Sequence, residues 1–158
     1  MYGKKSETVD AEAIKKILDR HKKKAKLALK LCAHCSLCAE SCFLYNTRGR
    51  KPEYMPSYKM IHSIGRLYNK KGRVDRAGLE EIREIVWEKC VLCTRCYCPL
   101  GIDIPEMIAL GRRVCRSQNV FPQYTEVENN NRLNNVRRMP ENRPAENSPA
   151  HFRPVKAA

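Results

Sequence analysis

The chain has 158 residues, of which 42% are hydrophobic and 30% charged, and this fits one small folded domain with extensions. Its net charge of +14 indicates an acidic partner, an anionic membrane surface or nucleic acid, without choosing among them. No apolar run approaches the ~18 residues needed to span a bilayer, and the first residues lack the apolar stretch of a signal peptide. We therefore expect a cytoplasmic chain whose thiols are kept reduced.

Residues 9–31 are predicted to form one amphipathic helix rich in lysine. Its apolar side chains recur at helical spacing and are Ala11, Ile14, Leu18, Ala25, Ala28 and Leu29. Two interpretations compete. Either the helix packs by this face and keeps its lysines in solvent, or it is an arm that docks on a partner or a membrane surface. We treat residues 1–30 as a basic N-terminal helical segment.

Three more helices are predicted between the first cysteines and the C-terminal tail. Residues 48–56 contain a glycine and two prolines and should form a loop, after which periodic apolar residues predict helices at 57–69 and 76–89. Asp103, Pro105 and Glu106 form a capping box that predicts a third helix at 104–117. The side chains expected to face inward are Met60, Ile61, Ile64, Leu67 and Tyr68, then Leu79, Ile82, Ile85 and Val86, then Ile104, Met107, Ile108 and Val114.

Residues 123–158 differ in composition from the rest of the chain. They hold many asparagines and prolines and few large apolar groups. Such a segment cannot bury enough surface to offset the entropy of ordering it. We predict an extended or disordered tail, and because no strand is predicted anywhere, an all-α fold.

Eight of the nine cysteines fall into two groups, Cys32-x2-Cys35-x2-Cys38-x3-Cys42 and Cys90-x2-Cys93-x2-Cys96-x-Cys98. An odd number of cysteines in a reducing compartment favours metal binding over disulfides. Three cysteines at this spacing can wrap three corners of a cubane, whereas a tetrahedral zinc site usually takes separated pairs. The pattern therefore predicts two 4Fe-4S clusters, with zinc as the weaker alternative.

The ligand sets follow from a rule known for two-cluster ferredoxins, in which the fourth cysteine of each run ligates the other cluster. The rule gives Cys32, Cys35, Cys38 and Cys98 to the first cluster and Cys90, Cys93, Cys96 and Cys42 to the second. Only Tyr97 separates Cys96 from Cys98, and this step reaches at most ~7 Å where the usual four-residue step reaches ~13 Å. Cys98 can ligate if the backbone turns sharply. Otherwise another group completes the first cluster.

Several residues near the two groups have predicted roles. Cys115 is interpreted as a buried structural thiol, with substitution for Cys98 as the alternative. His34 should lie beside the first cluster without ligating it, while Trp87 and Tyr97 should limit exposure of the second. The basic candidates for stabilising reduced clusters or steering an acidic partner are Arg48, Arg50, Lys51, Arg95 and Arg112. Plain solvated charge is the competing explanation for each of these five.

The segment Cys-Val-Leu-Cys-Thr-Arg-Cys-Tyr-Cys-Pro-Leu-Gly-Ile-Asp-Ile-Pro resembles the second cluster motif of the α-helical ferredoxins. Pro-Ser-Tyr-Lys-Met at residues 56–60, after the first motif, resembles the C group of heterodisulfide reductase proteins and related iron–sulfur subunits of sulfate-reducer membrane redox complexes. The resemblance covers about residues 30–122. It implies an all-α domain at residues 31–122 with two cluster-binding loops, flanked by the N-terminal helix and the tail. The short Cys96–Cys98 step departs from the family pattern.

The resemblance also implies a function. The chain would be a non-catalytic subunit that relays single electrons between a flavoprotein or cytochrome and a catalytic, CCG-type subunit. It would work in the cytoplasm or on the cytoplasmic face of a membrane complex, with membrane association through its partners and no small-molecule substrate of its own. Two alternatives remain open: an assembly subunit with structural clusters, and a basic nucleic-acid-binding module, which the 7% aromatic content disfavours.

Overall fold

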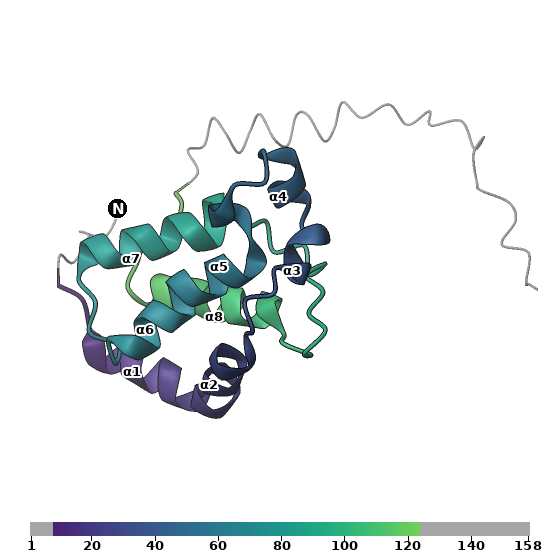
Figure 1. Cartoon of the computed structure of the whole chain (residues 1–158). Coiled ribbons are helices and arrows are strands. Elements are labelled where there is room, and N and C mark those ends of the chain that lie inside the picture. The colour runs from purple at the N-terminus through teal and green to yellow at the C-terminus, as the bar shows by residue number, and fades with distance from the viewer. Residues whose placement is uncertain (1–7, 124–158) are drawn as a thin grey trace, which may run out of the picture. The chain divides into compact units, whose positions relative to one another are not determined.

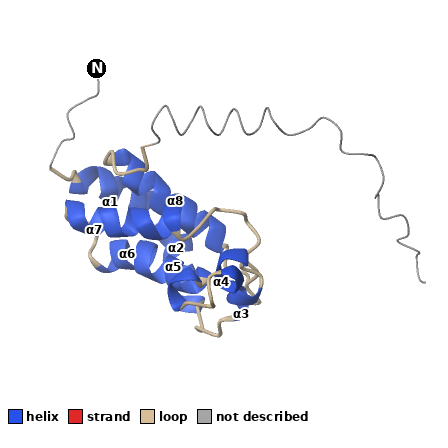
Figure 2. Ribbon diagram, turned by 90° about the horizontal axis from the view of Figure 1, so that it is seen from above, coloured by secondary structure: helices blue, strands red, loops and turns tan. Residues whose placement is uncertain are grey.

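Helices make up the regular structure of residues 8–123, the part of the chain that this computed structural model describes, and no strand occurs there (Figure 2). The predicted all-α fold is confirmed. In chain order the elements are α1 (Ala11–Arg20), α2 (Lys22–Leu31), α3 (Leu37–Glu40), α4 (Phe43–Thr47), the 3-10 turn η1 (Pro52–Tyr54), α5 (Pro56–Met60), the π-helical η2 (Ile61–Gly65), α6 (Arg66–Asn69), α7 (Arg76–Arg83), the π-helical η3 (Glu84–Glu88) and α8 (Ile104–Ser117). The tail predicted at 123–158 lies, apart from Gln123, outside the described residues.

The N-terminal segment forms two helices, so the prediction of one helix over 9–31 is wrong in this respect. The helix breaks at His21, because the Leu18 carbonyl accepts hydrogen bonds from the Tyr68 hydroxyl at 2.6 Å and from the His21 amide at 3.1 Å. The apolar faces of both helices join the common core, through Ile14 and Leu18 of α1 and through Ala25 and Ala28 of α2. This agrees with a lysine-rich helix packed by one face.

The helices predicted at 57–69 and 76–89 are present as continuous helical runs at 56–69 and 76–88. Each run widens into a π-helical segment, η2 or η3, which the sequence did not indicate. Gly72, with φ at 79°, closes the first run, and its amide donates to the Leu67 carbonyl at 2.8 Å. Asp75 starts the second run by accepting a hydrogen bond from the Gly78 amide at 3.0 Å.

Helix α8 has the bounds that the capping box predicts. The Asp103 carboxylate accepts a hydrogen bond from the Glu106 amide at 3.0 Å. The Glu106 side chain does not complete the box but pairs with Lys24 of α2. At Gly111 a Cβ atom would lie 3.1 Å from Cγ1 of Val86, so the glycine permits the close approach of α8 to η3. All four side chains predicted to face inward from this helix are buried.

Helix α8 is the centre of the helical unit that ends at Pro122, because it contacts α1, α5, α7 and both π-helical segments. The core between these elements is apolar and contains Ile14, Met60, Ile64, Leu67, Leu79, Ile82, Val86, Met107, Ile108 and Val114. The cysteine segments gather with α3 and α4 at one end of this unit (Figure 1; Figure 2). Within residues 8–123, no helix is both long enough and apolar enough to pass through a bilayer.

Candidate metal centre

Two cavities are each lined by four cysteines. Cys42, Cys90, Cys93 and Cys96 line one, called here the Cys42 cavity, and Cys32, Cys35, Cys38 and Cys98 line the other, the Cys98 cavity. Each cavity thus takes three cysteines from one run and one from the other, which is the grouping predicted from sequence. Within residues 8–123, no three His, Cys, Asp or Glu side chains could hold a single metal ion. The thiols surround a space, as is needed when each iron of a cubane takes its own sulfur ligand.

The two cysteine loops share one backbone pattern. The second and fourth residues after the first cysteine have positive φ in both: His34 and Ser36 at 55° and 64°, Leu92 and Thr94 at 54° and 62°. For residues other than glycine this conformation costs ~1–2 kcal/mol, and it persists where the surroundings enforce it, often at ligand sites. Alternating left-handed residues turn backbone amides into a concavity that suits anions, including iron–sulfur clusters. Both loops are therefore shaped for an anionic cofactor.

A sharp turn directly follows the short Cys96–Cys98 step. The Cys98 carbonyl accepts a hydrogen bond from the Gly101 amide at 3.0 Å, and Gly101 has φ at 69°. Just before the turn, the Tyr97 amide donates to the Ser41 hydroxyl at 3.1 Å, and this hydroxyl donates to the Cys38 carbonyl at 3.2 Å. Ser41 therefore ties the first cysteine run to the second where Cys96 and Cys98 part toward different cavities.

Burial differs among the eight thiols and affects their chemistry. Cys38, Cys42 and Cys90 are buried, whereas Cys35 and Cys93 are exposed. Burial, together with the neighbouring Cys90, Cys42 and Cys93, raises the pKa of the Cys96 thiol to about 12, although Lys59 acts to lower it. Iron binds the thiolate, so metal binding at this cavity must displace protons held by the apoprotein.

Lys59 is a residue of the Cys42 cavity that sequence reasoning missed. Its side chain is 2% exposed, and Nζ lies 3.7 Å from Sγ of Cys42. Apolar spacing predicts that Met60 and Ile64 on this helix face inward, but it gives no information about the lysine beside Met60. The sequence carried no signal of this burial, because a lysine is usually expected to be exposed.

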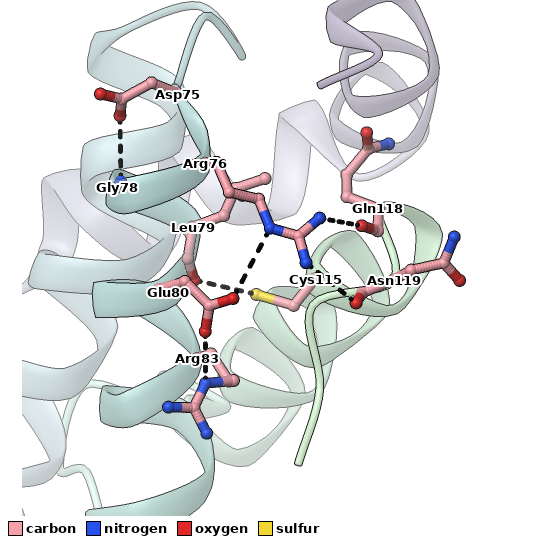
Figure 3. Close-up of polar contacts among 9 residues, drawn as sticks. All are labelled: Asp75, Arg76, Gly78, Leu79, Glu80, Arg83, Cys115, Gln118 and Asn119. Carbon is pink, nitrogen blue, oxygen red and sulfur yellow. Dashed lines mark hydrogen bonds and ion pairs between the residues drawn. The ribbon is translucent and has the colours of Figure 1, made fainter. Parts of the chain in front are cut away.

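Cys115 lies outside both cavities, between α7 and α8 (Figure 3). It is fully buried, and its Sγ donates to the Leu79 carbonyl at 3.9 Å. Burial and the nearby Glu80 raise the pKa of this thiol to about 12, although Arg83 lowers it. The position is that of a structural thiol, and it does not support substitution for Cys98.

The remaining candidates have varied surroundings. His34 is exposed and lines the Cys98 cavity. Neither Trp87 nor Tyr97 lines the Cys42 cavity: Trp87 packs below two arginine side chains, and Tyr97 is 65% exposed. Their role in shielding the second cluster stays a prediction. The four cations at Arg48, Arg50, Lys51 and Arg95 are exposed.

Arg112 differs from these four cations because it has a structural contact. Its guanidinium donates to the Val86 carbonyl at 2.8 Å and to the Cys90 carbonyl at 2.6 Å. It also lies 5.3 Å above the Trp87 ring. Arg112 therefore positions the first cysteine of the second run against the end of η3.

Comparison with protein families agrees with this geometry. Residues 28–102 match the family model of the 4Fe-4S dicluster domain, and the match includes all eight grouped cysteines. Searches of curated proteins and of solved structures gave no match. Residues 28–102 are therefore similar to 4Fe-4S dicluster domains, and this similarity supports two 4Fe-4S clusters and an iron–sulfur electron-transfer role.

Proposed function

We propose that the chain is a non-catalytic electron-transfer subunit that relays single electrons between partner subunits of a redox complex, like the C group of heterodisulfide reductase proteins. The proposal assigns Cys32, Cys35, Cys38 and Cys98 to one cluster and Cys42, Cys90, Cys93 and Cys96 to the other. The interleaved grouping of these cysteines around two cavities is the observation that carries it. Because each run contributes to both cavities, two redox centres would be held in a fixed mutual arrangement.

The surface around the cysteines supports a protein partner. Large apolar side chains stand exposed beside them in both runs, namely Leu37, Phe43, Val91 and Leu100. Exposed cations lie after the first cysteine group, at Arg48, Arg50 and Lys51, and within the second, at Arg95. Exposed apolar side chains and cations in the same two segments fit a partner surface that offers apolar and acidic residues.

The donor and acceptor chemistry would then belong to the partners. The relay would connect a flavoprotein or cytochrome on one side with a catalytic, CCG-type subunit on the other. The complex would sit in the cytoplasm or on the cytoplasmic face of a membrane, and this chain would reach the membrane through its partners.

Anaerobic purification with the co-purifying subunits tests the relay. We expect about eight irons per chain, two cubanes of four, and EPR signals from two clusters that become reduced and reoxidised during turnover in stopped-flow mixing. Far fewer irons, or no reducible signal, would refute the relay. Two clusters that keep one redox state throughout turnover would instead identify a structural role.

A pair of surface variants tests the docking face. Phe43→Ser should slow electron exchange with the partner while both cluster potentials stay unchanged. Phe121→Ser is the control, because Phe121 is also exposed but follows the C-terminal end of α8, which runs 14 residues or ~21 Å away from the cysteine loops. Equal rates for the two variants would place docking elsewhere.

A further inference from the structure

The buried ammonium group of Lys59 lacks an ordinary counter-charge. Removing a cation from water is costly unless an anion or several acceptors compensate it. Among residues 8–123, the hydrogen bonds and ion pairs of the structure give Lys59 one side-chain partner, the Cys42 sulfur, and no carboxylate. A neutral thiol is a weak acceptor. An anionic group bonded to Cys42 would supply the missing charge, and a thiolate-ligated cluster is such a group.

The lining of the Cys98 cavity has no cation equivalent to Lys59. Its lining contains the thiols, small and apolar residues, the exposed His34 and the buried Ser57, but no lysine or arginine. Ser57 and Lys59 belong to the same helix, α5, and are two residues apart. Because successive helical residues are rotated by about 100° (3.6 per turn), residues two apart point to different sides. Helix α5 therefore presents a hydroxyl to the Cys98 cavity and an ammonium to the Cys42 cavity.

We infer that Lys59 makes the two clusters unequal, by raising the reduction potential of the cluster in the Cys42 cavity above that of the cluster in the Cys98 cavity. The inference rests on the ligand sets of the proposed function. Reduction adds one electron, and therefore one negative charge, to the cluster. A fixed positive charge beside a ligand sulfur stabilises the reduced form more than the oxidised form. Burial keeps solvent ions from screening this interaction.

A direction for the relay follows from this inequality. An electron shared between the two clusters resides at equilibrium on the one beside Lys59. The partner that delivers electrons would then contact the loop of Cys32 and Cys35, and the partner that receives them would contact the loop of Cys90 and Cys93. Charge and hydrogen bonding to sulfur are known means of tuning cluster potentials, and Lys59 offers both at one atom.

The test is an EPR-monitored redox titration of the anaerobically purified full chain with both clusters bound. Lys59→Met removes the charge and keeps an unbranched side chain that is one atom shorter. We expect the reduced-to-oxidised ratio of one cluster, at a fixed potential, to fall at least tenfold, which is ~59 mV for a one-electron couple. Lys59→Arg should largely preserve that potential. Cys98→Ser, which alters the signal of the other cluster, identifies which signal is which.

Two further variants keep the test decisive if Lys59→Met does not assemble its clusters. Ser57→Lys places an ammonium at the Cys98 cavity and should raise the potential of that cluster instead. Arg95→Gln removes an exposed cation between Cys93 and Cys96. This variant should shift neither cluster potential by as much as Lys59→Met shifts one. If wild type lacks two reducible clusters, the relay itself fails. If wild type has both but the Lys59 and Ser57 variants shift neither, or shift both equally, the relay stands and the role of Lys59 is refuted.

Discussion

The hydroxyl of Ser41 accepts a hydrogen bond from the amide of Tyr97 at 3.1 Å, across 56 residues of sequence. Ser41 precedes Cys42, the one cysteine of the first run that lines the Cys42 cavity. Tyr97 lies between Cys96 and Cys98, which line different cavities. This contact is therefore placed where the two runs exchange cysteines, and it ought to matter more for cluster retention than for folding of the helices.

Ser41→Ala should weaken the contact between the two cysteine runs, because it removes the hydroxyl that accepts from the Tyr97 amide. Loss of this hydrogen bond costs ~1 kcal/mol, and we expect faster release of iron to a chelator with little change in helix content. Ser117→Ala is a matched control, since the Ser117 hydroxyl also donates to the carbonyl three residues earlier and also accepts one hydrogen bond, but within α8 and its end. Iron release as fast from Ser117→Ala as from Ser41→Ala would contradict the specific role of Ser41.

The two cysteines whose roles the sequence left open should respond differently to replacement by serine. Cys98→Ser should perturb or remove one cluster, because Cys98 lines a cavity with three other thiols. Cys115→Ser should leave about eight irons in place, because its sulfur faces the Leu79 carbonyl. Iron and sulfide analysis with EPR measures both. Loss of a cluster in Cys115→Ser at unchanged folding stability would show that this thiol does ligate iron.

Arg112 should hold the second cysteine run through its two carbonyl contacts. Arg112→Lys keeps the charge but loses the planar fork whose two nitrogens donate separately to the Val86 and Cys90 carbonyls, so we expect a loss of ~1.5–3 kcal/mol in the free energy of unfolding and faster iron release. Arg113→Lys is the control, since the neighbouring Arg113 is exposed and contacts His21. Denaturant titration of both variants compares them. If Arg112→Lys and Arg113→Lys have the same free energy of unfolding, the guanidinium fork of Arg112 is not needed for stability.

The sequence anticipated the helices well where capping residues and apolar periodicity agreed. Asp103 with Glu106 and Gly72 each mark a helix end that the structure contains. It did not anticipate the break at His21, because the cause is the hydroxyl of Tyr68, 50 residues away in the chain. The π-helical segments were not predicted either, because a local change to hydrogen bonds five residues apart does not show in the pattern of apolar residues.

Cysteine spacing predicted the grouping around the two cavities, including the exchange of Cys42 and Cys98. The details that shape the site were not predictable in the same way. Ser36, Leu92 and Thr94 are not residues that favour positive φ, so tertiary structure imposes the loop conformation. The burial of Lys59 also contradicts the usual expectation that lysine is exposed.

Alkaline pH should destabilise the folded chain through Cys115. The pKa of this thiol is raised from 9.0 to about 12, so above pH 9 the unfolded state loses a proton that the folded state keeps. The stabilising contribution is complete below pH 9 and is lost as pH rises toward 12, by at most ~1.4 kcal/mol per pH unit. Tyr68 acts in the same direction, with its pKa raised by burial and by Asp19 from 10.0 to about 12.

Denaturant titrations of the cluster-loaded protein between pH 8.5 and 10.5 measure this slope. Cys115→Ala should have lower stability at neutral pH, because of the lost packing, but a shallower decline above pH 9. The cluster-ligating thiols are the same in wild type and Cys115→Ala, so their contribution to the pH dependence cancels in the comparison. A decline equally steep in wild type and Cys115→Ala would mean that other groups cause the alkaline loss.

Removal of iron should relax the cysteine loops before it unfolds the helices. The core around α8 is filled by apolar side chains from α1, η2, α6 and α7, and its fully buried members include no cysteine except Cys115. The loops, in contrast, hold four residues in left-handed conformations that each cost ~1–2 kcal/mol. Without the cluster, the loops lose the group that offsets this cost, while the apolar core keeps its contacts.

Hydrogen exchange measured by mass spectrometry on loaded and iron-free protein separates the two regions. We expect amides of residues 32–42 and 90–101 to lose protection on iron removal, and amides of α7 and α8 to stay protected. Far-UV circular dichroism should retain most of its helical signal. Loss of protection in α8 together with the loops would show that the helical core depends on the clusters. That result would favour the structural role of the clusters that the relay proposal sets aside.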